Sequence, residues 1–169
     1  MIILKVISPK RIQPDVFRQE ILNELRKVET AVLKDYRKTT ATWNHKVQFD
    51  SKITFAKGSP GVIVETDDKI YGYVTYGTKA HPIVAHGNAL VFTWGGKGSY
   101  KAKTTPRVIG SQAGGPSGKT VFFKSVQHPG TEAREFHETI HEKWIDLFAE
   151  HMQDALDRGA KKCGHGMNI

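Results

Sequence analysis

One short stretch, residues 125–141 (SVQHPGTEAREFHETIH), joins the end of an apolar strand to a tight turn and then to a long helix. Residues 119–126 (KTVFFKSV) have the Val and Phe content of a buried strand. His128-Pro129-Gly130 ends this strand, because Pro donates no ladder hydrogen bond and Gly accepts turn dihedrals. Thr131 is then the predicted N-cap of the helix. We therefore expect sheet and helix to meet at this stretch.

Two segments have the periodicity of amphipathic helices, one near each end of the chain. Within residues 15–36, apolar side chains recur every three or four positions. They are Phe17, Ile21, Leu25, Val28, Val32 and Tyr36. Residues 133–158 carry a second such face, with Gly159 as the predicted C-terminal stop. Mixed acidic and basic residues cover the opposite face of the first helix, which favours packing on a sheet over binding to a membrane.

Between the helices the hydrophobic period changes to two residues, as in β-strands. Residues 42–56, 62–66 and 69–76 (KIYGYVTY) are separated by short turns and predict an antiparallel meander. Further strands are expected at residues 1–8, 89–94 and 119–126. The predicted fold is a single α+β domain over residues 1–169, in which a mainly antiparallel sheet packs against a long N-terminal and a long C-terminal helix.

The composition is typical of a globular protein, with 38% hydrophobic and 25% charged residues. No apolar run approaches the roughly 20 residues that a membrane-spanning helix needs. Cys163 is the single cysteine, so an intrachain disulfide is excluded. The polar residues 160–169 predict a mobile tail. A net charge of +8 favours a polyanionic partner, either nucleic acid or an acidic protein.

Residues 95–118 predict a long flexible loop, because they contain seven glycines and four basic residues but no acidic residue. This loop and the residue after it offer basic side chains to a neighbouring subunit or to DNA phosphates. These candidates are Lys97, Lys101, Lys103, Arg107 and Lys119. The GKT at 118–120 matches the end of a P-loop, but an apolar strand rather than a helix follows it, so we expect no nucleotide site.

Residues 137–141 (HETIH) match the HExxH pattern of zinc hydrolases. On a helix, His137 and His141 lie one turn apart and could bind zinc, with Glu138 as general base. A catalytic zinc needs a third protein ligand, and Glu150 would lie about 13 Å further along the same helix. A loop histidine would have to complete the site. The other interpretation is that these are exposed positions of a structural helix, and we expect neither a metal nor a cofactor.

Two motifs occur in a fixed order along the chain. Residues 73–78 (YVTYGT) precede His81-Pro82-Ile83, and residues 128–136 read HPGTEAREF. In this order they resemble the tail-completion, or head–tail joining, proteins of long-tailed bacteriophages, over roughly residues 16–144. The residues that match the family motifs are Tyr76, Gly77, Thr78, His128, Pro129, Gly130, Thr131, Arg134 and Phe136.

The resemblance implies a structural virion protein and not an enzyme. Such proteins form an oligomeric ring, commonly a hexamer, in the neck between head and tail, and genomic DNA passes through its lumen. The implied partners are other copies of the chain, neighbouring neck and tail proteins and DNA, with assembly in the host cytoplasm and no membrane. Two alternatives stay open on the residues alone. They are a small zinc metallopeptidase using His137, Glu138 and His141, and a basic nucleic-acid-binding module using residues 95–119.

Overall fold

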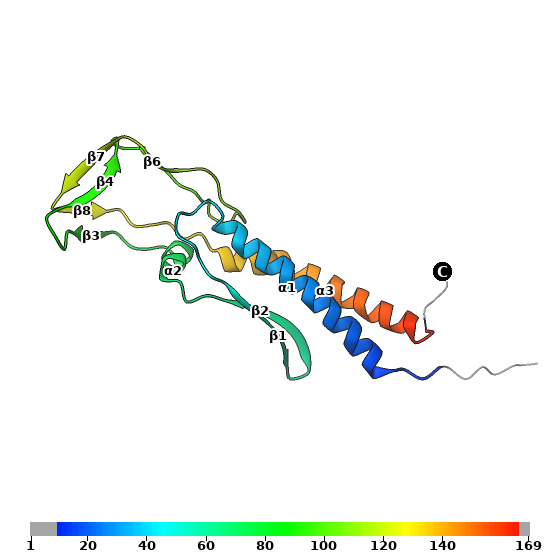
Figure 1. Cartoon of the computed structure of the whole chain (residues 1–169). Helices are drawn as coiled ribbons and strands as arrows, with labels where there is room; N and C mark the ends of the chain where they lie inside the picture. The colour runs from blue at the N-terminus through cyan, green and yellow to red at the C-terminus, as the bar shows by residue number, and fades with distance from the viewer. Residues whose placement is uncertain (1–9, 166–169) are drawn as a thin grey trace, which may run out of the picture. The chain divides into compact units, whose positions relative to one another are not determined.

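A computed structural model describes residues 10–165 (Figure 1). These residues group into two compact units, of which the first contains 10–31, 51–63 and 143–165 and the second contains 32–50 and 64–142. Helices α1 (Pro14–Thr39) and α3 (Phe136–Lys162) each run through both units. The predicted strand at residues 1–8 and the end of the predicted tail, 166–169, lie outside the described residues.

The described chain is α+β, with three helices and four small two-stranded sheets. The pairs are β1 (Asp50–Ala56) with β2 (Ser59–Glu65), β3 (His81–Val84) with β8 (Ser125–His128), β4 (Leu90–Trp94) with β7 (Lys119–Phe123), and β5 (Tyr100–Lys101) with β6 (Gly115–Pro116). The expected continuous sheet is therefore not formed. One physical reason lies at Lys124, which divides the predicted strand 119–126 into β7 and β8 and sends them to different partners.

Residues 69–76, predicted as a strand, form helix α2 (Lys69–Tyr76). The Asp68 side chain caps this helix by accepting a hydrogen bond of 2.8 Å from the backbone N–H of Tyr71. The alternation of tyrosines suggested a strand, but Tyr71 and Thr75, four residues apart, are the buried pair. The prediction was wrong because a capped first turn overrode the two-residue period.

The core of the second unit is aromatic and consists of Trp43, Phe49, Tyr71 and Phe136. The Tyr71 ring stacks on Phe136 with centroids 5.8 Å apart and meets Phe49 edge-on at 5.1 Å. Burial raises the pKa of the Tyr71 phenol, so this ring stays neutral at physiological pH. Phe136 is fully buried and is also the first residue of α3, so the core fixes where that helix starts.

In the first unit, the N-terminal part of α1 lies beside the C-terminal part of α3 (Figure 1). Leu25, Val28 and Ala155 are its buried apolar residues. The predicted stop at Gly159 is wrong, because α3 continues to Lys162. Gly159 instead allows a close approach of α1, since a Cβ there would lie 2.8 Å from Cδ1 of Phe17. Cys163 is buried at the end of α3, so residues 160–163 of the predicted tail belong to the folded unit.

Two carboxylates on α1, those of Glu20 and Glu24, are buried between these helices. Arg158 donates to both of them, and its Nε lies 3.1 Å from Glu20 Oε2. Lys162 reaches Glu20, and His151 Nδ1 lies 2.8 Å from Glu24 Oε1. Hydrogen bonds from Lys162 and Arg158 lower the pKa of Glu20. Burial alone would raise the pKa of Glu24, but hydrogen bonds from Lys27 and His151 outweigh it and keep this pKa below the usual value.

No helix within residues 10–165 combines the length and hydrophobicity needed to cross a membrane.

The ion cluster predicts acid sensitivity. A carboxyl whose pKa is lowered by folding stabilises the folded state above its unfolded pKa, and this stabilisation is lost as the pH falls through the folded pKa. We expect the free energy of unfolding to decrease as the pH falls below about 4.5. Urea denaturation between pH 7 and pH 3 measures this. Glu24→Gln should show a shallower decrease than the unchanged protein, and an equal slope would contradict the assignment.

The aromatic core predicts a large effect of truncating Phe136. Phe136→Ala should lower the free energy of unfolding by about 3–5 kcal/mol, the usual cost of removing a fully buried phenyl ring. Tyr73→Ala is the matched control, because the Tyr73 ring on α2 is 60% exposed and should change stability by less than about 1 kcal/mol. Chemical denaturation of both variants checks the pair. Equal losses would show that the core is placed elsewhere.

Candidate functional site

The two sequence motifs meet at one backbone junction in the second unit. The N–H of Thr78 donates to the carbonyl of Thr131 at 2.9 Å, and the N–H of Thr131 donates back to the carbonyl of Thr78 at 3.0 Å. The side-chain hydroxyl of Thr78 also accepts from the Thr131 N–H, at 3.0 Å. Residues 53 positions apart in the chain are thereby held together as an antiparallel bridge.

A glycine on each side permits this close approach. Gly77 has φ of 75° and Gly130 has φ of 92°, a region of backbone space that residues with a Cβ rarely occupy. A Cβ at Gly77 would lie 2.6 Å from the Thr131 carbonyl oxygen, and one at Gly130 would overlap the Thr78 carbonyl oxygen. The glycines of the two motifs therefore face each other's backbone.

Strands β3 and β8 continue the junction. Their antiparallel register pairs His81 with His128 and Ile83 with Val126. The two imidazole rings lie with centroids 5.1 Å apart, and the N–H of Gly130 donates to Nδ1 of His128 at 3.0 Å. The strand ends at His128, two residues beyond the predicted end at residue 126 and directly before Pro129. His81, at the start of β3, and His128, at the end of β8, therefore lie side by side.

The remaining motif residues lead into α3. The N–H of Arg134 donates to the carbonyls of Val74 and Thr75 on α2, each at 3.1 Å. Glu135 follows with φ of 50°, and its carbonyl accepts the first helical hydrogen bond from the N–H of Thr139. Thr131 is therefore not the N-cap that the sequence predicted, because α3 begins five residues later and Thr131 is already paired.

The HETIH segment occupies the first turns of α3. The His137 ring lies 5.1 Å from the Tyr76 ring, and its Nε2 lies 2.8 Å from Oε1 of the neighbouring Glu138. His141 is exposed. Within residues 10–165, no three His, Cys, Asp or Glu side chains are grouped closely enough to hold a metal ion. The arrangement thus ties His137 and Glu138 to each other and brings no third ligand to them.

The basic residues of segment 95–119 divide into two kinds. Lys103 Nζ donates to the Thr42 carbonyl at 2.9 Å, and Arg107 Nε donates to Glu135 at 2.8 Å, so these two anchor the segment to its own unit. Lys97, Lys101 and Lys119 are exposed. The pairing of β5 with β6 and hydrogen bonds such as Ser117 N–H to the Ser99 carbonyl, at 2.8 Å, give this glycine-rich segment a defined course.

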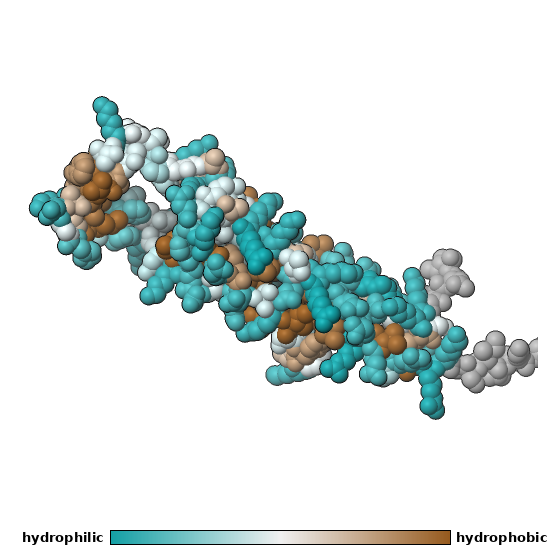
Figure 2. Space-filling view, in the orientation of Figure 1, coloured by the Kyte–Doolittle hydropathy of each residue, from teal (hydrophilic) through white to brown (hydrophobic). Residues whose placement is uncertain are grey.

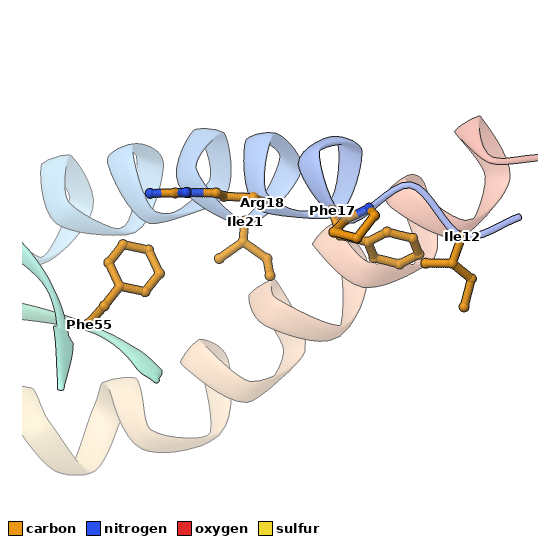
Figure 3. A pocket seen from close by; sticks show the side chains of 6 residues that line it. Ile12, Phe17, Arg18, Ile21 and Phe55 are labelled. Carbon is orange, nitrogen blue, oxygen red and sulfur yellow. The ribbon is translucent and has the colours of Figure 1, made fainter. Parts of the chain in front are cut away.

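An open hollow of about 600 Å³ lies in the first unit between the start of α1 and the β1–β2 hairpin (Figure 3). Its lining is Ile12, Pro14, Phe17, Arg18, Ile21 and Phe55. Figure 3 shows Phe55 pointing from the hairpin towards α1. Arg18 is the one charged side chain in this lining, and the lining contains no nucleophile, carboxylate or imidazole. The hollow therefore offers no catalytic group.

No protein family model, curated protein or solved structure matches this chain.

The junction predicts a sharp difference between two glycines. Gly130→Ala should lower the free energy of unfolding by about 1–3 kcal/mol or more, because it combines a strained φ with a clash against the Thr78 carbonyl. Gly87→Ala, at a position with open space and no positive φ, should change it by less than about 0.5 kcal/mol. Urea denaturation of both variants tests this, and equal stability of the two would contradict the close approach.

Proposed function

We propose that this chain is a head–tail joining protein of a long-tailed bacteriophage, a structural subunit of the ring at the neck. The observation that carries the proposal is the contact between the YGT and HPGT motifs at Thr78 and Thr131. Each motif alone is short enough to occur by chance. Two chance matches would have no reason to pair residue by residue, or to place their glycines against each other's carbonyl groups.

The chemistry of the junction supports a structural role. Its motif residues contribute backbone hydrogen bonds, close glycine contacts and the buried Phe136 ring, which are functions of packing and not of catalysis. The HETIH residues lie on the helix that this junction starts, and His137 is engaged with Tyr76 and Glu138. The zinc metallopeptidase alternative has no comparable support, because no third ligand group lies near these residues in the described chain.

The charge distribution suits a ring around DNA. Residues 69–131 contain eight Lys or Arg residues and no Asp or Glu. Such a segment attracts phosphate groups by a term that does not depend on base sequence, as a channel for any genome requires. The same property would serve a basic nucleic-acid-binding module, but only the joining role also accounts for the paired motifs.

Loss of the protein should separate heads from tails. In lysates of a phage with an early stop codon in this gene, electron microscopy should show DNA-filled heads and finished tails that are not joined. Adding the purified protein should rejoin them and restore infectivity. Intact, infectious particles formed without the protein would overturn the proposal.

Variants of the HETIH segment distinguish the enzymatic alternative. Glu138→Gln and His141→Ala change exposed side chains, so both should rejoin heads and tails as well as the unchanged protein does. A metallopeptidase would lose its general base or a zinc ligand and with it all activity. Loss of joining in both variants, together with one zinc ion per chain in the unchanged protein, would favour the enzyme.

A further inference from the structure

The ribbon formed by β4 and β7 has an uncovered apolar surface. Val91 and Phe122 are directly opposite each other in the register and are 60% and 67% exposed. Figure 2 shows a group of hydrophobic side chains over these two strands, bordered by hydrophilic ones. Apolar side chains that stand next to each other and remain this open to water are typical of interaction surfaces.

The opposite face of the ribbon is apolar too. It carries Leu90, Phe92, Trp94, Val121 and Phe123, of which the Phe92 and Phe123 rings stack with centroids 5.8 Å apart and Trp94 is 46% exposed. This face is partly covered by its own rings, whereas the face with Val91 and Phe122 is not. An isolated two-stranded ribbon is marginally stable in water, so covering the open face with a partner would stabilise it.

Positive charge borders the ribbon without any compensating negative charge. Lys124 follows β7 and, because side chains alternate along a strand, lies on the side of Phe122. Lys119, the register partner of Trp94 at the other end of the ribbon, lies on the opposite side. Both side chains are exposed. Since residues 69–131 contain no Asp or Glu, a protein surface that covers the ribbon must bring acidic groups of its own.

Such a surface lies on α3. Five acidic residues recur there at intervals of four, and all five are exposed. They are Glu138, Glu142, Asp146, Glu150 and Asp154. Glu138 pairs with His137, and the other four form no ion pair among the described residues. Like charges at this spacing destabilise a helix by a few tenths of a kcal/mol per pair. Ile145, which is 57% exposed, is three residues after Glu142 and so lies beside this acidic row.

We propose that the open face of the β4–β7 ribbon docks on the acidic row of α3 in a second copy of this chain. The ribbon contributes Val91, Phe122 and Lys124, and α3 contributes Ile145 and its carboxylates. The lengths agree, because a five-residue strand spans about 17 Å, which is about three turns of helix. This contact rests on the self-association contained in the proposed function and names the two surfaces that make it.

A second copy fits the ribbon better than DNA does. Val91 and Phe122 lie on the exposed face within the ribbon and Lys124 lies beyond its end, which is the arrangement of a protein–protein interface with a polar rim. A DNA-binding face would place cations at the centre of the contact. Docking of a second copy also gives the acidic row on α3 a binding partner, whereas that row would repel DNA. Because ribbon and row are different surfaces, each copy can bind one neighbour with each of them.

A charge exchange between copies tests the contact. One variant reverses the ribbon (Lys124→Glu), and another reverses the helix (Glu150→Lys). Each alone brings like charges together and should weaken self-association about tenfold or more in sedimentation equilibrium. An equimolar mixture should associate again, since every ribbon then finds a row of opposite charge. Lys34→Glu, on an exposed position of α1, changes the net charge as the ribbon variant does and should associate normally.

Disulfide trapping gives a second measurement that does not depend on charge. Chains with Phe122→Cys, mixed with chains with Ile145→Cys, should form a covalent pair on oxidation, and neither variant should do so alone. The native Cys163 is buried and can stay in place. Circular dichroism confirms that each variant is folded before either measurement.

Several results would overturn the contact. They are an unchanged protein that stays monomeric at the highest concentration, reversed variants that associate normally, and a mixture that does not recover. Normal association of the ribbon variant together with loss of duplex DNA binding would assign the ribbon to DNA instead. If heads and tails are rejoined while the charge exchange fails, the joining role stands and the contact is wrong. If the exchange succeeds and joining does not depend on the protein, the contact stands and the joining role is wrong.

Discussion

The paired backbones of Thr78 and Thr131 are the constraint on which the second unit depends. Helix α2 ends immediately before this bridge, and β3 and β8 continue it in a fixed register. The turn into α3 follows it on the other side, where Arg134 is bonded to α2 and Phe136 enters the core. Moving the bridge by one residue would bring a Cβ against a carbonyl group, so the two glycines select this register among its neighbours.

The first unit depends on charge as well as on apolar packing. Glu20 and Glu24 are one turn apart on α1 and face Arg158, with Lys162 and His151 at either side on α3. Removing two carboxylates from water costs free energy. Here at least two hydrogen-bond donors offset that cost for each carboxylate. A purely apolar contact between two helices tolerates sliding by a turn. We infer that these ion pairs fix the register of the helices, because a shift would leave a buried carboxylate without its partner.

The hydrophobic periodicity of the sequence predicted the two long helices. Features that depend on contacts between distant residues were not predicted. The apolar stripes located α1 and α3, and the end of a strand before Pro129 followed from the chemistry of proline and glycine. The strand predicted at residues 69–76 is a helix because Asp68 caps its first turn, and an Asp at this position is a signal for a helix start in the sequence itself. Gly159 failed for another reason. A glycine that ends a helix and one that admits a neighbouring ring look the same without the neighbour, here Phe17.

In the candidate site, too, the sequence identified single residues but not the contacts between them. The motif residues were identified individually, but their pairing across 53 positions needed coordinates. Of the five basic candidates, Lys103 and Arg107 serve their own unit, a distinction that no count of lysines could provide. Acidic residues are absent not only from residues 95–118 but from the whole of residues 69–131, and the sequence alone shows this.

Segregation of charge along the chain has a structural consequence of its own. Segment 69–131 contains no Asp or Glu, while α3 presents carboxylates at intervals of four. The positive charge of the segment is therefore not offset by acidic residues within it and is more favourable beside carboxylates from outside it. In the proposed contact two different surfaces meet head to tail, and such a contact closes into a ring if successive rotations add up to a full turn and otherwise continues as a filament. The geometry of that contact, and not the net charge, would then set the number of copies.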